Sequence, residues 1–338
     1  MNQCLNILAQ SSDYYAPFAG VMLTSLFENN KDIEHISVYL VTTDMSENNK
    51  KRFQCLSKQY KRTIKFIDAK KMDCFLTKNQ VPKYHDSYAA YYKMFALSMI
   101  EDSIERLVYL DSDIIINGSL EKLITEDLDG KTLGMVIDPS PEEYKKIIKV
   151  NSRYYYNTGV IIFDVKKWND LECEKQVVEY IKERQVIYPI ADQDIVNVVF
   201  QDEISTIPLK YNFPTGALIF KEFNFFKKAY GVRNYYSEEE FIQVQKKPTV
   251  IHYLGPFGTK PWLNMNLSSQ YWPAKNLWRK IYSKSLWNDF PCIQQKMSFI
   301  NRIQFTLFRM LPNNLFSIIH RNCIYLIWKH KTVSLRTY

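Results

Sequence analysis

Asp111 and Asp113 are separated by one residue and directly follow the apolar segment 107–110. In an extended chain, residues i and i+2 point to the same side, so the two carboxylates face the same way. Neighbouring carboxylates repel each other unless a cation lies between them. A divalent ion held by two carboxylates keeps coordination positions for phosphate oxygens. The pair therefore predicts a metal site that binds the phosphates of a nucleotide.

The Asp-x-Asp pattern occurs at two further places, so each pair has to be considered in its context. Asp127 and Asp129 lie in the turn-like segment TEDLDG, which we interpret as a solvated loop. The third pair, Asp192 and Asp194, lies on either side of Gln193 and opens a predicted helix after Pro189. Asp192 either caps this helix and interacts with its dipole, or it hydrogen-bonds sugar hydroxyls, with Gln193 near the reacting carbon.

A histidine and a Gly/Pro-rich loop could complete a metal and phosphate site. His252 ends the predicted strand 249–252, and it is either structural or a ligand for a transition metal such as manganese. The following loop, 254–262, contains Gly255 and a single lysine, Lys260. A mobile loop with a lysine at its tip could close over a diphosphate and neutralise a leaving group.

Three other polar residues are either structural or surface groups, or they contact a ligand. Asn157 and Thr158 precede the predicted strand 160–163, and they form either a plain turn or a set of donors to a ligand hydroxyl. Lys93 follows two tyrosines on a predicted helix, and it is either a surface charge or a phosphate contact. None of these residues decides the function by itself.

Short apolar strands alternate with amphipathic helices through the first 265 residues. The predicted strands are 6–9, 37–41, 64–67, 107–110, 134–137, 160–163, 204–207 and 249–252. The predicted helices are one that Ser46 caps, 88–100, 169–185 and one beginning at Asp192. This alternation predicts an α/β fold with a mostly parallel, twisted sheet and helices on both faces. Ligands collect at the carboxyl ends of such strands, where the segment SSDYY and the Asp111 pair both fall.

Composition excludes several classes of protein. The chain has nine glycines and contains neither G-x-G-x-x-G nor G-x-x-x-x-G-K-[ST], so the usual glycine-rich phosphate loops are absent. The six cysteines are scattered without a C-x-x-C pair, which suits a reducing compartment better than a zinc site or a disulfide framework. The first ten residues do not resemble a signal peptide, and no apolar run is long enough to span a membrane. We therefore expect a cytoplasmic protein.

The positive charge is concentrated at the C-terminal end. Residues 266–338 contain eleven Lys and Arg and a single acid, Asp289, which gives this segment a net charge of +10. The rest of the chain has a net charge of −2, so the total is +8. Two amphipathic helices are predicted there, at 297–311 and 315–328. Basic residues beside Phe, Trp, Leu and Ile are typical of helices that lie in a membrane interface, although a helix packed on the body with a solvated basic edge is the alternative. We predict a domain at 1–265 and a membrane-associating tail at 266–338.

The order of the motifs resembles glycosyltransferase family 8. The segments SSDYYA, YYKM, VYLDSD, YYNTGV, DQDIVN and HYLG…KPW follow one another over roughly residues 3–263. Within the family, the bacterial lipopolysaccharide galactosyl- and glucosyltransferases are the most similar, since they too end in a basic, aromatic, membrane-associating tail. The resemblance implies a fold of the GT-A type, a Rossmann-like α/β arrangement with a mixed, mostly parallel sheet. It also implies a UDP-sugar donor, a glycan or glycolipid acceptor and a bound Mn²⁺ or Mg²⁺ ion.

The resemblance also assigns roles to residues of this chain. Three residues fall on the metal ligands, namely Asp111, Asp113 and His252. Ser12, Asp13 and Tyr15 fall in the loop that holds uridine, with Tyr15 stacked on uracil. The remaining positions on the donor are Lys93, Ser112, Asn157, Thr158, Asp192, Gln193, Gly255 and Lys260, of which Asp192, Gln193 and Lys260 are the expected catalytic residues. Acceptor contacts are expected within 210–248.

The implied reaction transfers a hexose with retention of anomeric configuration. A double displacement needs a carboxylate beneath the sugar, whereas the matching residue is the amide Gln193, so front-face attack by the acceptor hydroxyl is expected. The chain departs from the family at Ser12 and Tyr14, where Asp and Asn are frequent, and at Lys93, which replaces an arginine. The segment from HYLG to KPW is also two residues longer than the short form.

Three other functions are compatible with parts of the sequence. A nucleic-acid-binding protein would use the basic aromatic tail, but this reading leaves Asp111 and Asp113 unexplained. A relative that binds the donor without catalysis would lack part of the metal set, whose residues are all present. A metal-dependent nucleotidyl- or phosphotransferase would be expected to carry a glycine-rich loop after its first strand.

Overall fold

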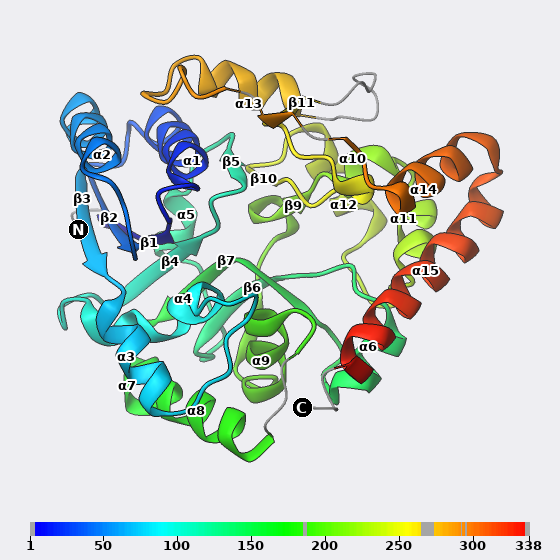
Figure 1. Cartoon of the computed structure of the whole chain (residues 1–338), viewed down its shortest axis with the longest axis horizontal. Helices are drawn as coiled ribbons and strands as arrows, with labels where there is room; N and C mark the ends of the chain where they lie inside the picture. Colours follow the sequence, from blue (N-terminus) through cyan, green and yellow to red (C-terminus); the bar gives the residue numbers. More distant parts are fainter. Residues whose placement is uncertain (1–3, 185–187, 265–273, 292, 295, 335–338) are drawn as a thin grey trace.

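The computed structural model describes residues 4–184, 188–264, 274–291, 293–294 and 296–334 of the chain. Its centre is a seven-stranded sheet in the order β3-β2-β1-β4-β7-β6-β8. The strands are β1 (Cys4–Gln10), β2 (His35–Thr42), β3 (Thr63–Asp68), β4 (Arg106–Leu110), β6 (Leu133–Ile137), β7 (Tyr156–Asp164) and β8 (Ile204–Thr206). Only β7 runs antiparallel to its neighbours among these strands, so the predicted mixed, mostly parallel sheet is confirmed (Figure 1).

A smaller sheet lies beside the carboxyl end of β4 and carries His252. It has the order β5-β10-β9, with β5 (Ile114–Ile116), β9 (Phe213–Pro214) and β10 (Val250–His252). β10 is antiparallel to β5, and His252 pairs with Ile114. A third pair joins β11 (Leu263–Asn264) to β12 (Ile293–Gln294). The small sheet therefore returns a distant segment of the chain to the two aspartates.

Helices cover both faces of the large sheet. Alternate residues of β1 enter different cores: Ile7 packs with helices α1 and α2, while Leu8 packs with α3, α8 and α9. The first nine helices are α1 (Ala16–Glu28), α2 (Glu47–Tyr60), α3 (Lys70–Lys78), α4 (Tyr92–Phe95), α5 (Glu121–Ile124), α6 (Glu142–Ile148), α7 (Val165–Asp170), α8 (Cys173–Arg184) and α9 (Ala191–Val199). The others are α10 (Gly216–Ile219), α11 (Phe223–Tyr230), α12 (Glu238–Lys246), α13 (Lys275–Tyr282), α14 (Phe299–Met310) and α15 (Asn313–Ser334). Short 3-10 turns are η1 (Ala89–Tyr91), η2 (Leu97–Met99), η3 (Leu209–Tyr211) and η4 (Pro256–Gly258).

Two predicted helices differ from the structure. The segment 88–100 forms three short turns, η1, α4 and η2, because its residues 91–95 are all buried and no solvent-facing side remains for one amphipathic helix. The prediction 169–185 covers the end of α7 and all of α8, which are separated at Glu172, whose φ is 50°. The predicted N-cap is confirmed, since Ser46 Oγ accepts a hydrogen bond from the Asn49 amide.

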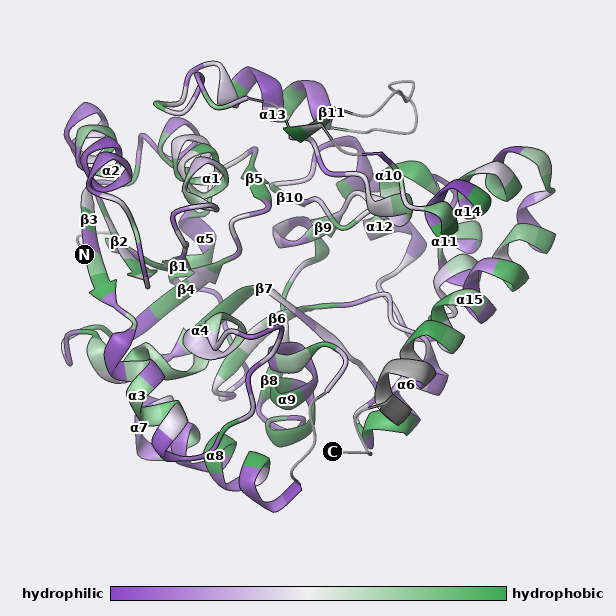
Figure 2. Ribbon diagram, viewed as in Figure 1, coloured by the Kyte–Doolittle hydropathy of each residue, from purple (hydrophilic) through white to green (hydrophobic). Residues whose placement is uncertain are grey.

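The two predicted C-terminal helices are confirmed as α14 and α15. Ser298 caps α14, whose end precedes Pro312, and α15 starts at the next residue. Both helices show hydrophobic and hydrophilic bands in Figure 2. α15 lies along α11 (Figure 1), and Phe316 of α15 belongs to the same core as the residues of β1 and α1. None of the helices in the described part of the chain combines the length and apolar character needed to cross a membrane.

Candidate functional site

The two aspartates lie where β4 ends, between the carboxyl end of β1 and the start of β5. The Asp111 amide donates to Gly159 O at 2.9 Å, and Ser112 Oγ donates to Gln10 O at 2.8 Å. Asp113 O accepts from the Tyr253 amide at 3.0 Å, which ties the pair to the segment after β10. The backbone therefore fixes both carboxylates against three other segments.

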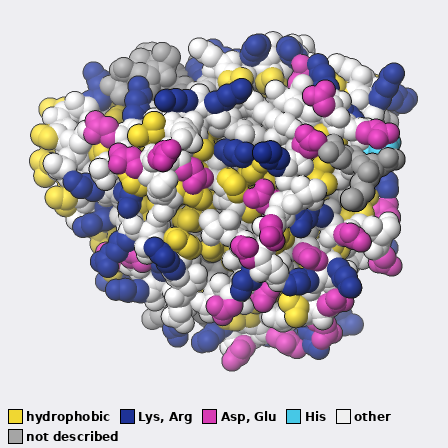
Figure 3. All heavy atoms as spheres, turned by 180° about the vertical axis from the view of Figure 1, so that it is seen from behind, with side chains coloured by type: hydrophobic (Ala, Val, Ile, Leu, Met, Phe, Trp, Pro, Cys, Tyr) yellow, Lys and Arg dark blue, Asp and Glu magenta, His cyan; other side chains and the backbone are white. Residues whose placement is uncertain are grey.

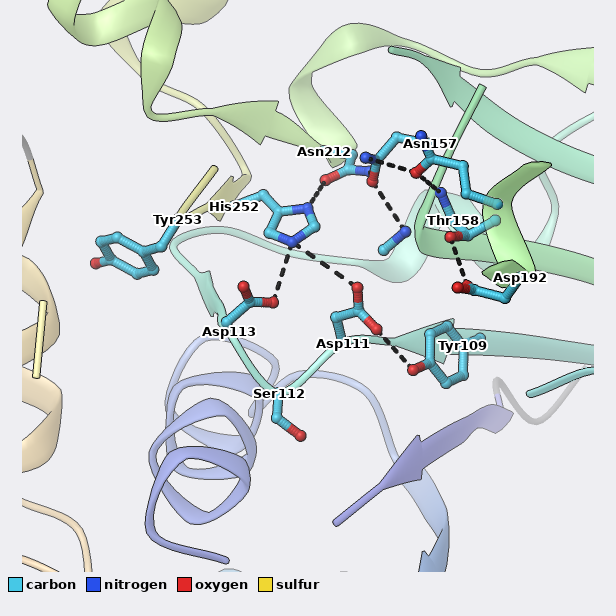
Figure 4. A network of polar contacts seen from close by, with 12 residues as sticks. Tyr109, Asp111, Ser112, Asp113, Asn157, Thr158, Asp192, Asn212, His252 and Tyr253 are labelled. Atoms are coloured by element: carbon cyan, nitrogen blue, oxygen red, sulfur yellow. Dashed lines mark hydrogen bonds and ion pairs between the residues drawn. The ribbon is translucent and has the colours of Figure 1, made fainter. Parts of the chain in front are cut away.

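Asp111, Asp113 and His252 form a compact cluster, with one ligand atom from each residue lying within 4.8 Å of the others. His252 Nε2 is 3.0 Å from Asp113 Oδ1 and 3.8 Å from Asp111 Oδ2, and the imidazole is only 1% exposed. Figure 4 shows the ring between Asn212 on one side and the two aspartates on the other. With Nδ1–H donated to Asn212 Oδ1 at 2.8 Å, Nε2 is the nitrogen that faces the carboxylates.

This donor set fits a divalent cation. Two carboxylates and a neutral imidazole suit manganese, and carboxylates alone suit magnesium. The hydrogen bond from Nδ1 to Asn212 orients the ring, as outer residues do around bound metals. Gly159 leaves room for the ring, because a Cβ atom at this position would lie 2.2 Å from His252 Cε1. We name these residues, Asp111, Asp113 and His252, the metal triad.

Lys260 stands against the metal triad. Its Nζ is 2.6 Å from Asp113 Oδ2 and donates to Tyr253 O at 2.7 Å. Burial raises the pKa of Asp113, but the charge of Lys260 and the hydrogen bonds from Lys260 and His252 outweigh burial and lower it well below the usual value. Asp113 is therefore ionised at neutral pH, as a metal ligand must be.

A continuous polar network joins the metal triad to Gln193, and Figure 4 shows its part from His252 through Asn212 to Asn157. Asn212 Nδ2 donates to Asn157 Oδ1 at 2.7 Å, and Asn157 Nδ2 donates to Gln193 Oε1 at 3.1 Å. The Thr158 amide also donates to Gln193 Oε1, at 3.2 Å. These bonds run through four segments far apart in the sequence and hold the amide of Gln193 in one orientation.

A second path joins Asp111 to Asp192. The buried Lys93 Nζ lies 3.5 Å from Asp111 Oδ1 and 2.7 Å from Asp192 Oδ2. Burial opposes the charge on this lysine, but the two carboxylates outweigh it and raise its pKa. Thr158 Oγ1 donates to Asp192 Oδ2 at 2.8 Å, and Ile190 occupies the cap position of α9. Asp192 therefore does not cap its helix.

A cavity of about 510 Å³ opens beside these residues, a volume typical of sites for small ligands. Its lining residues are Gln10, Ser11, Ser12, Tyr15, Val41, Thr43, Ser87, Ala89, Tyr92, Tyr109, Asp111, Ser112, Asp113, Lys260 and Trp262. The lining thus includes six of the residues expected to contact the donor or the metal, namely Ser12, Tyr15, Asp111, Ser112, Asp113 and Lys260. The Tyr15 side chain is half-exposed. The cavity sits at the carboxyl ends of β1, β2 and β4, as expected for a largely parallel sheet.

Asp13 and Gly255 are not among the residues that line this cavity. The Asp13 carboxylate accepts from the Ser46 amide at 2.9 Å and from Asn49 Nδ2 at 2.7 Å, so it anchors the start of α2. A Cβ atom on Gly255 would lie about 3 Å from the hydroxyls of Thr259 and Thr215, so this glycine allows the loop to pack closely. Their predicted donor contacts remain predictions.

Three polar residues of the network were not singled out from the sequence. Asn212 orients His252, and Tyr109 Oη donates to Asp111 Oδ1 at 2.6 Å. Asp138 accepts from Asn157 Nδ2 at 2.8 Å, and burial raises the pKa of its carboxyl. Asp138 had a recognisable signal, since it follows the predicted strand 134–137 directly, and Tyr109 lies within the motif VYLDSD. Asn212 lies in the segment YNFP, which contains no motif.

The metal triad and the polar network around Gln193 thus form one connected set of side chains beside the cavity. The fold is shared with the solved galactosyltransferase LgtC, which was crystallised with donor and acceptor sugar analogues: the TM-score is 0.66 at 22% identity, over 84% of this chain and 99% of that one. The predicted GT-A fold is thereby confirmed. Residues 6–266 match the family model described as "Glycosyl transferase family 8", and the chain belongs to this family.

Two curated relatives are each 24% identical to this chain over most of its length. Lipopolysaccharide 1,2-glucosyltransferase of Escherichia coli (strain K12) is 24% identical over 298 residues, which cover 85% of this chain and 80% of that protein. General stress protein A of Bacillus subtilis (strain 168) is 24% identical over 300 residues, covering 87% and 99% of the two chains. The similarity to both relatives extends beyond the part of the chain that matches the family model.

Proposed function

We propose that this protein transfers a hexose, glucose or galactose, from a UDP-sugar to a hydroxyl of a glycan acceptor, with retention of anomeric configuration. The observation that carries the proposal is the unbroken network from the metal triad through Asn212 and Asn157 to Gln193. It supports the proposal because the residues expected to bind a diphosphate and those expected to bind a sugar belong to one connected network. The family membership and the sugar transferases among the relatives support the same reaction.

The residues of the donor site have distinct roles in this proposal. The metal triad would hold Mn²⁺ or Mg²⁺, which supplies positive charge to the departing diphosphate. Lys260 would add a second positive charge at the same oxygens. Ser12, Asp13 and Tyr15 would hold uridine, with the half-exposed Tyr15 ring stacked on uracil. Ser112 and Gly255 would complete the contacts around the diphosphate.

The sugar would lie against the inner wall of the site. Asp192, which pairs with Lys93, would accept hydrogen bonds from sugar hydroxyls together with Asn157 and Thr158. Gln193 would lie beneath the reacting carbon. An amide is a poor nucleophile, so the acceptor hydroxyl would attack from the face that the diphosphate leaves, which retains the configuration.

A donor-turnover assay tests this proposal. Purified protein is incubated with UDP-glucose or UDP-galactose and a panel of glycosides, with and without MnCl₂, and released UDP is measured by chromatography. We expect metal-dependent release of UDP, and a product whose anomeric proton is equatorial, with the small H1–H2 coupling of an α-linked sugar, as in the donor. A protein that releases UDP from neither donor under any of these conditions would contradict the proposal.

We also propose that the enzyme acts at the cytoplasmic face of an anionic membrane, in the synthesis of lipopolysaccharide or another surface polysaccharide. Figure 3 shows hydrophobic side chains gathered at the edge that α14 forms, with Lys and Arg nearby. The exposed apolar residues there include Phe299, Ile300, Ile303 and Met310, and Arg302 and Arg309 are exposed on the same helix. Sedimentation with vesicles tests it: binding to anionic but not to neutral vesicles is expected, and no binding to either would refute it.

A further inference from the structure

The loop that carries Lys260 contacts the C-terminal helices at its other side. Residues 254–262 leave β10, form the turn η4 and return to β11. Lys260 points to Asp113, while Phe257, three residues earlier, points away from the cavity and is only 2% exposed. The short loop thus connects the metal triad to the residues that bury the Phe257 side chain.

Phe257 is buried by rings that come mainly from α14 and α15. Its ring centroid lies 5.4 Å from Phe305, 5.5 Å from Phe308 and 6.4 Å from His320. Phe220, at the end of α10, is the fourth ring, at 6.4 Å. We name these four residues, Phe220, Phe305, Phe308 and His320, the Phe257 socket. Three of its four members belong to the C-terminal helices.

The backbone of the loop depends on this contact. Phe257 has φ 67° and Gly258 has φ 66°, a left-handed conformation that is unusual for a bulky residue. Such a conformation persists only where the surrounding structure enforces it. Asn301 of α14 closes the other side, because a Cβ atom on Gly258 would lie 2.8 Å from Asn301 Nδ2. The position of α14 therefore determines the path of the loop.

The socket is itself anchored to the body of the protein. Phe308 lies 5.4 Å from Phe220 and 6.3 Å from Phe225 of α11, and Phe316 is fully buried in the main core. Lys228 Nζ of α11 donates to Asn314 Oδ1 at 3.1 Å. These contacts fix α14 and α15 against the body of the protein. The two helices can therefore hold the loop in a fixed position.

We propose that α14 and α15 position Lys260 through the Phe257 socket, which makes the C-terminal helices a working part of the donor site. The inference rests on the proposed function for the role of Lys260 at the diphosphate. Its consequence is specific: loosening the socket displaces Lys260 but leaves the metal triad intact. Phe305 is then a positioning residue, because it acts on the substrate only through the loop.

The test compares Phe305→Ala with Phe299→Ala, an exposed phenylalanine on the same helix that is 69% exposed and lies outside the socket. Hydrogen–deuterium exchange is measured on residues 254–262 and on β4, and calorimetry measures binding of Mn²⁺ alone and of UDP with Mn²⁺. In Phe305→Ala we expect exchange in 254–262 to rise about fivefold or more, with β4 unchanged. UDP affinity should fall about tenfold or more, since Lys260 is misplaced, while Mn²⁺ alone should bind at least as tightly as to the unaltered protein, because a displaced Lys260 no longer competes for Asp113. Phe299→Ala should change none of these values.

Gly258→Ala is a second variant, for the case that Phe305→Ala lowers the melting temperature too far. Its matched control is Gly130→Ala, because Gly130 has φ 69° but lies in a turn where a Cβ atom would meet only Lys167 Nζ at 4.0 Å. Both substitutions strain the backbone equally, and only the first pushes against α14. We expect only Gly258→Ala to raise exchange in 254–262 and weaken UDP binding.

Three results would overturn the inference, and they differ from failure of the proposed function. Unchanged exchange in the loop of folded Phe305→Ala would show that the socket does not hold it. Faster exchange with unchanged UDP affinity would show that the loop does not serve the donor site. Equal loss of UDP affinity in Phe299→Ala would show an unspecific effect. If the unaltered protein fails to bind UDP, the proposed function fails, while the exchange experiment still tests the socket.

Discussion

Replacing Lys260 by methionine is expected to change metal and nucleotide affinity in opposite directions. Lys260 Nζ lies 2.6 Å from Asp113 Oδ2, so in the absence of a metal ion the lysine neutralises a carboxylate of the metal triad. A metal ion has to compete with this positive charge. Once UDP is present, the same lysine is expected to leave Asp113 for the diphosphate, where it contributes favourably.

The size of the effect follows from the geometry of the pair. Lys260 is 30% and Asp113 is 23% exposed, so solvent screens part of the interaction. A charged hydrogen bond in such a setting contributes about 1–2 kcal/mol. Mn²⁺ alone should therefore bind to Lys260→Met about tenfold more tightly. UDP with Mn²⁺ should bind about tenfold to a hundredfold more weakly, because a charge-assisted contact to phosphate is lost.

Isothermal titration calorimetry measures both affinities on the same samples. Lys31→Met is a matched control, since Lys31 is 63% exposed and lies 3.7 Å from Glu28, far from the metal triad in the sequence. This control should leave both affinities within about twofold of the unaltered protein, as expected for a screened surface pair. Weaker or unchanged binding of Mn²⁺ to Lys260→Met would refute the reasoning, because it would show that the lysine does not compete for the site.

Three further predictions concern buried groups. Asn212→Ala should weaken Mn²⁺ binding about tenfold to a hundredfold in calorimetry, because His252 loses its orienting partner; an unchanged affinity would contradict this. Lys93→Met should lower the free energy of unfolding in urea by about 3–5 kcal/mol, because two facing carboxylates lose their buried partner; a loss below about 1 kcal/mol would count against it. Burial lowers the pKa of His320 to about 4, so between the usual value of 6.5 and 4 the unfolded chain binds a proton that the folded chain does not. His320 by itself should therefore lower the free energy of unfolding by about 3 kcal/mol on acidification from pH 7 to 4, and His320→Phe should remove this part of the pH dependence; an identical pH profile for the variant would contradict it.

The regular elements near the site were predictable from the sequence because their signals are local. The apolar run before Asp111 predicted β4, and Ser46 predicted the start of α2. Alternating strands and helices predicted the sheet on which the site is built. The broken helix at 88–100 was missed, since burial of consecutive side chains overrides a helical pattern that looks continuous.

The contacts that give the site its geometry were beyond the sequence because they join distant segments. Asn212 lies 40 residues from His252, and no pattern connects the two. The role of Asp192 was left open between cap and ligand, and the structure excludes the cap because Asp192 binds Lys93 and Thr158. The contact of Phe257 with α14 was unpredictable for the same reason. The division of the chain at residue 265 stays a prediction.

Binding of UDP with and without Mn²⁺ tests the central claim most directly, because it requires neither the acceptor nor the identity of the sugar. Calorimetry on the unaltered protein, Asp113→Asn and Asp129→Asn is the complete experiment. Asp129 belongs to another Asp-x-Asp pair and has a φ of 51°, a conformation that asparagine tolerates. We predict that UDP binds only when Mn²⁺ is present, that Asp113→Asn abolishes this binding and that Asp129→Asn preserves it. Binding of UDP without metal, or equal binding by Asp113→Asn, would contradict the assignment of the metal triad.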